Sequence, residues 1–182
     1  VKELRPGEMA VFKNGRMYKE TYFRIRAQEH TDSETETIEK TRYLLTDAIN
    51  RQLVTDVPMC FFLSGGLDSS IICKTASNYY KKNNLGQIHT YSVEYEDNRK
   101  YFKQNAFQPN ADFDYISIMS DDTSSVHTEI VLDNEKVMQA LYDSVKARDL
   151  PGYVDIDSSL LLFCKEVKKD YTVALSGECA DE

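Results

Sequence analysis

The chain has 182 residues, of which 41% are apolar and 29% are charged, with a formal net charge of −8 and a pI near 5.0. It is long enough for one well-packed domain, and its acidic balance argues against a surface for nucleic acid or anionic membrane, which needs clustered Lys and Arg. No stretch approaches the roughly 20 apolar residues of a membrane span. A cytoplasmic protein is therefore expected.

The first part of the chain is predicted to form a small β-hairpin. Two extended runs, Met9–Phe12 and Arg16–Ile25, flank Asn14-Gly15, which is a strong signal for a two-residue hairpin turn. This piece has too little apolar surface to be stable alone. The polar, acidic segment 27–36 that follows is typical of a linker and marks a domain boundary.

From residue 33 onward, helical patterns alternate with apolar strands. Ser33 and Glu36 have capping-box spacing, so a helix is expected from about Glu34 to Leu53. Further helices are expected at 67–82, 134–147 and 157–168, with a weak one at 113–120, and strands at 59–63, 88–95, 127–132 and 171–175. This alternation indicates an α/β fold with an open parallel sheet and helices on both faces, preceded by the hairpin.

The strand at 59–63 leads into Ser64-Gly65-Gly66-Leu67-Asp68-Ser69-Ser70 and then into a helix. Unpaired backbone N–H groups and the positive end of the helix dipole favour an anion there, and two glycines let a phosphate approach the backbone closely. The carboxylate of Asp68 would repel a phosphate unless a divalent cation lay between them, which predicts Mg²⁺. A Ser-Gly-Gly turn alone is equally well interpreted as strand-to-helix punctuation. The residues that follow it favour a binding site.

A second Ser-Gly turn, Ser176-Gly177-Glu178-Cys179-Ala180-Asp181-Glu182, follows the last expected strand. Ligands of parallel sheets bind at the carboxyl ends of the strands, so both turns are expected to face one crevice if their strands are neighbours. Asp181 would then hold Mg²⁺ together with Asp68. Without the first turn, Glu178 and Asp181 would be better interpreted as solvated charges beside a helix N-terminus.

The histidine and cysteine residues carry weaker signals. No ligand-spaced His, Cys or carboxylate accompanies His127, so a packing or surface histidine is expected there. The four cysteines include no Cys-x-x-Cys pair, which argues against a zinc or redox site and favours reduced thiols. Cys60, Cys73 and Cys164 are expected to be buried.

Together the two motifs resemble those of a known family. Ser64–Ser70 resembles the PP-loop of ATP pyrophosphatases, and Ser176–Glu182 is similar to the Ser-Gly-Glu-Gly-Ala/Ser-Asp-Glu signature of glutamine-hydrolysing asparagine synthetases; Asp56-Val57-Pro58 matches as well. The resemblance covers residues 32–182 and implies an adenine nucleotide alpha hydrolase-like synthetase domain, truncated at its C-terminus. Residues 1–28 resemble the end of the amidotransferase domain that precedes it.

The resemblance implies ATP-dependent amidation of aspartate to asparagine through β-aspartyl-AMP, with release of AMP and pyrophosphate. The implied cofactors are ATP and Mg²⁺, and the implied substrates are small molecules: aspartate, ATP, and ammonia from glutamine in the full enzyme. No nucleic acid or membrane partner is implied, and a homodimer is one open alternative for the assembly.

The resemblance also implies roles for single residues. Glu178 and Asp181 are implied to be catalytic, with Glu178 near the β-aspartyl centre. The resemblance leaves the role of Arg148–Gly152 open, and we hypothesise that this segment borders the aspartate pocket. Asp68 and Asp181 are implied to bind Mg²⁺. The nucleotide is implied to contact Phe62 and Val93 with Ser176 and Gly177 at the adenine, and Ser64, Gly65, Gly66, Asp68, Ser69 and Ser70 at the pyrophosphate.

Three departures from the family pattern bear on activity. Cys179 stands where the family usually has Gly, and the chain contains neither the catalytic lysine beyond the second motif nor the N-terminal cysteine nucleophile. The chain alone is therefore expected to make little or no asparagine. Two alternatives stay open, namely a β-lactam synthetase-like enzyme and a non-catalytic nucleotide-binding domain.

Overall fold

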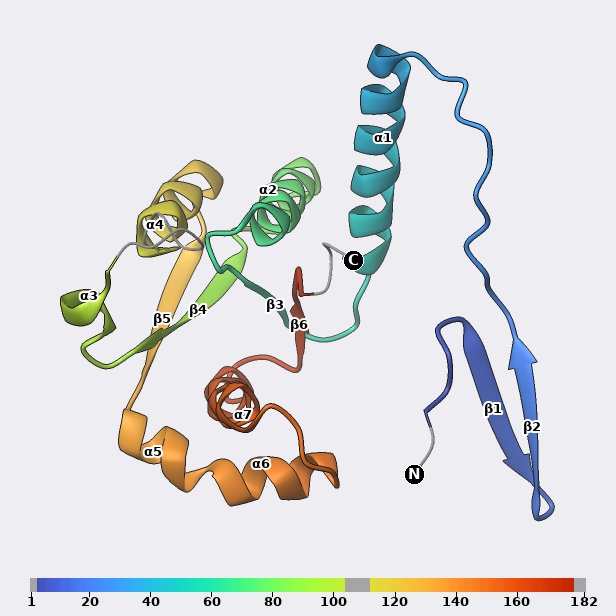
Figure 1. Ribbon diagram of the computed structural model, residues 1–182. Coiled ribbons are helices and arrows are strands. Elements are labelled where there is room, and N and C mark those ends of the chain that lie inside the picture. The colour runs from blue at the N-terminus through green and yellow to red at the C-terminus, as the bar shows by residue number, and fades with distance from the viewer. Residues whose placement is uncertain (1–2, 104–111, 179–182) are drawn as a thin grey trace. The chain divides into compact units, whose positions relative to one another are not determined.

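The computed structural model describes residues 3–103 and 112–178 of the chain (Figure 1). The chain divides into two compact units, Val1–Thr41 and Arg42–Glu182, and the division falls inside helix α1 (Glu34–Gln52). None of the helices in the described ranges is long and apolar enough to cross a membrane.

The first unit contains the expected hairpin. Strands β1 (Glu8–Lys13) and β2 (Arg16–Thr21) pair antiparallel across Asn14-Gly15, whose φ angles of 52° and 72° are the positive values that a tight two-residue turn requires. The second strand ends earlier than the expected Ile25. Its pairing stops because the backbone N–H groups of Tyr22 and Phe23 both donate to the carbonyl of Gly7.

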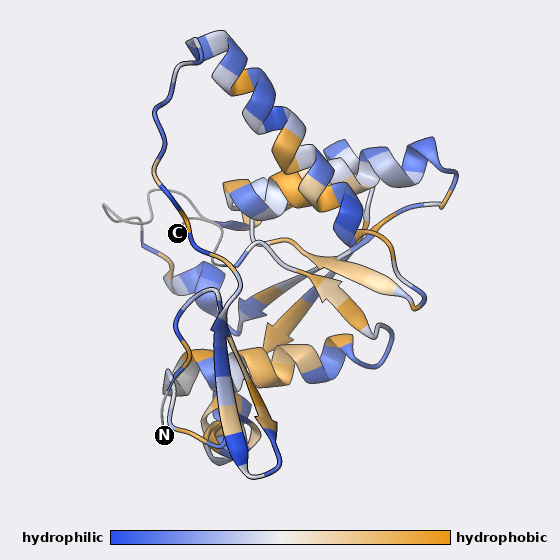
Figure 2. Cartoon of the chain, turned by 90° about the vertical axis from the view of Figure 1, so that its right-hand side faces the viewer, coloured by the Kyte–Doolittle hydropathy of each residue, from blue (hydrophilic) through white to orange (hydrophobic). Residues whose placement is uncertain are grey.

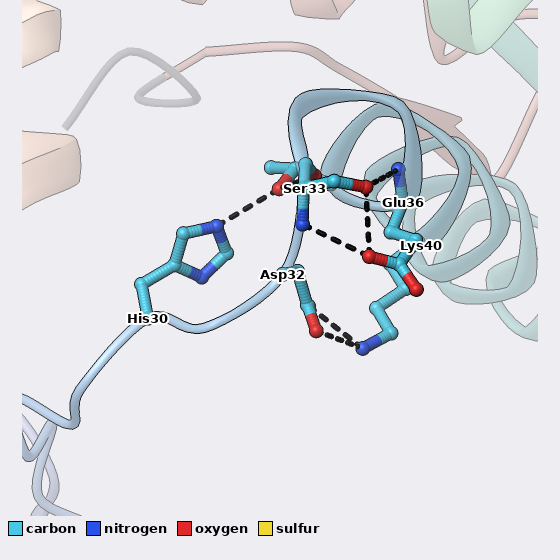
Figure 3. Close-up of polar contacts among 6 residues, drawn as sticks. His30, Asp32, Ser33, Glu36 and Lys40 are labelled. Atoms are coloured by element: carbon cyan, nitrogen blue, oxygen red, sulfur yellow. Dashed lines mark hydrogen bonds and ion pairs between the residues drawn. The ribbon is translucent and has the colours of Figure 1, made fainter.

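The start of α1 is fixed by the capping box that the sequence predicts (Figure 3). The backbone N–H of Ser33 donates to Glu36 Oε2 at 2.9 Å, and the backbone N–H of Glu36 donates to Ser33 Oγ at 3.3 Å. Lys40 Nζ pairs with Asp32 at 2.7 Å one turn further on. The prediction of a helix from Glu34 is confirmed.

The second unit is built on a four-stranded parallel sheet in the order β5-β4-β3-β6. The strands are β3 (Met59–Phe62), β4 (His89–Tyr95), β5 (Val126–Leu132) and β6 (Val173–Leu175). The chain moves from β3 outward to β4 and β5 and then returns to place β6 on the other side of β3. The strand order therefore reverses between β3 and β6, where open α/β sheets bind ligands.

Helices cover both faces of this sheet (Figure 1). Helices α2 (Leu67–Lys82) and α4 (Asp112–Thr123) lie on one face, and α5 (Asn134–Gln139), α6 (Leu141–Arg148) and α7 (Val154–Val167) lie on the other. In β3, Phe61 packs with Cys73 of α2 and Ile116 of α4, whereas Cys60 packs with Phe163 of α7. This alternation gives two apolar layers and confirms the predicted fold class.

The hydropathy of the chain follows these layers (Figure 2). Orange and blue alternate along the strands of the parallel sheet, with long orange stretches, and mostly hydrophilic colour marks the segment that leads from β2 to α1. Both apolar clusters lie within the second unit. That unit therefore has its own hydrophobic core.

Five expectations need correction. The helix expected at 134–147 is two helices separated at Ala140 (φ −77°, ψ −3°), because the bend lets both α5 and α6 pack on α7. A short helix α3 (Asn98–Tyr101) forms where no helix was expected, and α4 is longer than expected. Helix α7 begins at Val154 rather than 157. Cys164 is exposed, not buried as expected.

Candidate functional site

The two Ser-Gly turns lie side by side at the carboxyl ends of β3 and β6. Leu175, the last residue of β6, pairs with Phe61, and the turn that follows passes directly over the start of α2. A Cβ atom added to Gly177 would stand 2.9 Å from the backbone nitrogen of Ser69 and 3.0 Å from Cβ of Asp68. The expectation that both turns face one crevice is confirmed, and only glycine fits at position 177 without a shift.

The first turn is held by its own hydroxyl groups. Ser69 Oγ accepts from the backbone N–H of Ser64 at 3.2 Å, lies 3.0 Å from Ser64 Oγ, and donates to the carbonyl of Gly66 at 3.1 Å. Ser70 Oγ also donates to that carbonyl, at 2.7 Å. These bonds fix the strand-to-helix turn before any ligand is present, which reduces the ordering cost of binding.

Glycine serves two different purposes in this turn. Gly65 has a φ of +81°, and a Cβ there would lie 2.6 Å from the carbonyl oxygen of Asp112, so both the backbone angle and the approach of α4 require glycine. Gly66 is the N-cap of α2 and offers no side chain to the first-turn amides. Helix N-termini without a capping side chain bind anions readily.

A cavity of about 830 Å³ opens at this end of the sheet. Nine of the residues predicted from the sequence line it, namely Phe62, Ser64, Gly66, Asp68, Ser69, Val93, Ser176, Gly177 and Glu178. Gly65 and Ser70 support the turn without lining the cavity, and Asp181 lies outside the described residues. The structure therefore gathers most of the predicted site around one space.

The cavity has one apolar wall. The ring of Phe62 lies 4.7 Å from the ring of Phe163, centroid to centroid, and Leu160 and Val93 extend this surface. Tyr91 contributes from the same strand as Val93, and burial raises the pKa of its hydroxyl to about 12. A neutral, apolar wall of this kind suits a flat, uncharged ring system.

The rest of the lining is acidic. Carboxylates come from Asp68, Glu94, Asp112, Glu129 and Glu178, and Arg99 is the one basic side chain among the described lining residues. A polyanion would be repelled by this wall unless cations accompanied it, and carboxylate oxygens are the ligands that Mg²⁺ and Ca²⁺ prefer. The donor set therefore fits a divalent cation. Within the described residues no three His, Cys, Asp or Glu side chains form a complete metal cluster.

Sequence reasoning missed the group around Arg99. Its Nε donates to Glu94 Oε2 at 3.5 Å, its terminal nitrogen pairs with Glu129, and its guanidinium carbon lies 4.9 Å from the ring centroid of Phe113. These residues come from α3, β4, β5 and α4, and no short motif links them. Only the pairing of β4 with β5, which places Ser92 opposite Glu129, brings the acidic partners to one edge.

His127 is a packing histidine, as expected. Its Nδ1 lies 2.9 Å from Thr90 Oγ1 and its Nε2 lies 3.1 Å from Ser92 Oγ, so both ring nitrogens have a hydroxyl partner. Burial lowers the pKa of the imidazole, and the nearby charge of Glu129 opposes this only in part. Ser92 lines the cavity, which connects the histidine indirectly to the site.

The segment before α7 is held separately. Arg148 pairs with Asp157 across the loop, and Gly152 lies so close to this pair that a Cβ would collide with the Asp157 carboxylate. Residues 148–152 are not among the described residues that line the cavity. The expectation that they border a substrate pocket stays a prediction.

A family model and similar curated proteins indicate the same family. The asparagine synthase family matches residues 40–182. Asparagine synthetase [glutamine-hydrolyzing] 3 of Bacillus subtilis is 45% identical over the whole chain, which corresponds to 30% of that relative, and human asparagine synthetase [glutamine-hydrolyzing] is 27% identical over 82% of the chain and 26% of the relative. The chain thus spans less than a third of the length of these relatives.

Among solved structures, an NAD+ synthetase from Burkholderia pseudomallei superimposes with a TM-score of 0.39 at 12% identity. The match covers 79% of this chain and 62% of that chain.

Proposed function

The chain belongs to the asparagine synthase family, and from this premise we propose that its cavity binds ATP with Mg²⁺ and serves the ATP-dependent conversion of aspartate to asparagine. The observation that carries the proposal is the contact of Gly177 with the backbone of Asp68 and Ser69. It joins an anion-binding helix N-terminus to a second acidic turn at the point where the strand order of the sheet reverses.

The nucleotide is proposed to lie along the cavity from its apolar wall to the turn at 64–70. The base packs against Phe62 and Val93, and the phosphates face the amides at the start of α2 and the hydroxyls of Ser64 and Ser69. Mg²⁺, when bound, neutralises phosphate charge, and Asp68 with Asp181 would hold it. This places cation ligands beside the phosphates in a cavity whose other charges are mostly negative.

The chemistry proposed for this site is a substitution at the α-phosphorus of ATP. A β-carboxylate oxygen of aspartate attacks the α-phosphorus, the bond to the β-phosphate breaks, and β-aspartyl-AMP and pyrophosphate form. The amides and hydroxyls of the turn stabilise the charge that grows on the leaving pyrophosphate.

Ammonia then attacks the β-acyl carbon, AMP leaves with the electron pair of the acyl–oxygen bond, and asparagine results. Glu178 follows Gly177 on the lining of the cavity, where its carboxylate can accept the proton that the attacking nitrogen loses. We propose this proton-accepting role for Glu178, and a role at the bound Mg²⁺ for Asp181, because the family pattern implies that both residues are catalytic.

A polypeptide of residues 1–182 alone is expected to bind nucleotide but to form little asparagine, because it covers less than a third of its relatives. Binding is therefore the primary test. Isothermal titration calorimetry with ATP and Mg²⁺ is expected to show saturable binding, and Asp68→Ala is expected to weaken it about tenfold or more. Asp122→Ala is the matched control, because it removes an exposed carboxylate of α4 that pairs with Lys74 of α2 and does not line the cavity.

Two results would overturn the proposal. One is no heat of binding for the wild-type polypeptide, and the other is an equal loss in the Asp68 and Asp122 variants. A β-lactam synthetase-like enzyme would have the same turns, so the substrate distinguishes it: pyrophosphate release that depends on a carboxyethyl-arginine-type substrate rather than on aspartate would favour that alternative. Binding without any release would favour a non-catalytic nucleotide-binding domain.

A further inference from the structure

Arg99 lies between two acidic side chains at the outer end of the cavity. Its Nε donates to Glu94 and its terminal nitrogen pairs with Glu129, while its guanidinium carbon lies over the ring of Phe113, 4.9 Å from the ring centroid. All four residues line the cavity. One side chain of α3 therefore contacts β4, β5 and α4 at the same time.

Glu94, the partner of Arg99 on β4, uses both of its carboxylate oxygens to hold the start of α3. Glu94 Oε1 accepts from the backbone N–H of Tyr95 at 2.9 Å and from Asn98 Nδ2 at 2.7 Å, in addition to the bond from Arg99 to its other oxygen. Its side chain is only 13% exposed, compared with 32% for Glu129 and 51% for Arg99. The carboxylate of Glu94 thus anchors both the first and the second residue of α3.

Two roles for Arg99 are physically reasonable. As the one basic side chain in the described lining, it could leave its partners and bind a phosphate directly. Against this, two carboxylates already neutralise it, and to contact a phosphate it would have to give up both ion pairs and the stacking on Phe113. The number and arrangement of its partners favour a fixed position.

We propose that Arg99 is a positioning residue: held by Glu94 and Glu129 and stacked on Phe113, it keeps α3 and Phe113 in place as the outer wall of the nucleotide cavity. One consequence rests on the proposed function: nucleotide affinity depends on these four residues together, and not on a contact between Arg99 and phosphate. The group is called the Arg99 clamp, comprising Glu94, Arg99, Phe113 and Glu129.

The first experiment needs no ligand. The chain contains no tryptophan, so Phe113→Trp introduces a single tryptophan next to the guanidinium of Arg99, which can be excited selectively at the red edge of the tyrosine absorption. In this background, Arg99→Gln and Glu129→Gln are both expected to increase quenching by acrylamide, because each releases the wall. Arg51→Gln, which breaks an exposed ion pair with Asp47 in α1, is the control and is expected to leave quenching unchanged. Unchanged quenching in Arg99→Gln would overturn the clamp.

The second experiment compares ATP with adenosine by calorimetry. For a positioning role, Arg99→Gln and Glu129→Gln each weaken both ligands about fivefold to tenfold, and the double variant is no weaker than either single one, because the two residues act as a unit. Arg99→Lys, which cannot reach both carboxylates in a fork, restores affinity only in part. Thermal midpoints are expected to stay within a few degrees, since exposed ion pairs contribute little to stability.

A direct phosphate contact gives the opposite pattern and would refute the positioning role. Arg99→Gln would then weaken ATP but not adenosine, and Glu129→Gln would strengthen ATP, because it removes a negative charge and frees the guanidinium. A wild-type chain that binds neither ligand would instead count against the proposed function. In that case the quenching experiment still decides whether the clamp exists.

Discussion

Gly177 packs directly on the backbone of Ser69: a Cβ at position 177 would lie 2.9 Å from the Ser69 nitrogen, closer than real Cβ atoms approach. This one contact joins the turn after β6 to the start of α2. Because backbone atoms make this contact, the backbone itself sets the distance between the two acidic turns. Any side chain at 177 must push the second turn away from the first.

Gly177→Ala is therefore expected to weaken ATP binding strongly and to lower the free energy of unfolding by about 1–3 kcal/mol, as overpacking does in a close-packed region. The control is Gly86→Ala, where φ is +87° but no atom lies within 4 Å of the added Cβ. That substitution costs stability through backbone strain alone. Urea unfolding and calorimetry with ATP separate the two, and unchanged ATP affinity in Gly177→Ala would show that the turns do not act together.

Local patterns predicted the elements of the fold well, because local interactions determine them. The capping box at Ser33 and Glu36 and the Asn14-Gly15 turn each involve residues a few positions apart, and both are formed as expected. The strands were recognisable from apolar runs since a parallel sheet is buried on both faces. The order of the strands was not predicted: the two Ser-Gly turns were expected to meet only if their strands were neighbours, and the pairing of β3 with β6 fulfils that condition.

The parts that sequence reasoning missed depend on distant contacts. Arg99 and Glu129 are 30 residues apart and meet only because β4 and β5 pair. The break at Ala140 likewise reflects the packing of α5 and α6 on α7, which helical periodicity alone does not reveal. Specific side-chain groups of the site were therefore harder to predict than its backbone.

His127 is expected to make stability fall at acidic pH. Burial lowers the pKa of its imidazole below the ordinary value of 6.5, so the folded state favours the neutral ring. Because the unfolded chain binds the proton more readily, this contribution is fully present above pH 6.5 and is lost as the pH falls through the lower pKa of the folded state. The ring signals of His127 are expected to titrate below the ordinary value of 6.5.

The measurement is proton NMR over pH 4.5 to 8, with His127→Gln used to assign the signals of the three histidines. The same variant also tests the linkage. Urea unfolding at acidic and neutral pH is expected to show a smaller difference in His127→Gln than in the wild type. An imidazole pKa at or above 6.5 would contradict the buried, hydroxyl-bonded state.

The thiols are expected to differ sharply in reactivity. Burial raises the pKa of Cys60 and of Cys73 to about 12, whereas Cys164 is exposed and its pKa is raised by partial burial and then by the charge of Glu178. In a Cys179→Gly background, a thiol reagent at pH 8 is expected to label Cys164 alone until the protein is unfolded.

The link to Glu178 can be tested in the same assay. Glu178→Gln removes the nearby negative charge, which lowers the pKa of Cys164 and is expected to speed its labelling about twofold to threefold. Glu166→Gln removes a negative charge from α7, the helix that carries Cys164, where Glu166 pairs with Lys169, and it is expected to have little effect. Equal acceleration by both variants would mean that Glu178 does not face the thiol.

Phe61 and Phe62 are neighbours in β3 with opposite roles, because successive side chains of a strand point to opposite faces. Phe61 is fully buried between the sheet and α2, whereas Phe62 contacts Phe163 and lines the cavity. Phe61→Leu is expected to lower the free energy of unfolding by about 1–1.5 kcal/mol and to leave ATP affinity unchanged. Phe62→Leu is expected to weaken ATP and adenosine alike with a smaller loss of stability. Urea unfolding and calorimetry on these two variants test this assignment. If Phe61→Leu weakened ATP and Phe62→Leu did not, the base would not pack against Phe62, and the apolar wall would not belong to the proposed site.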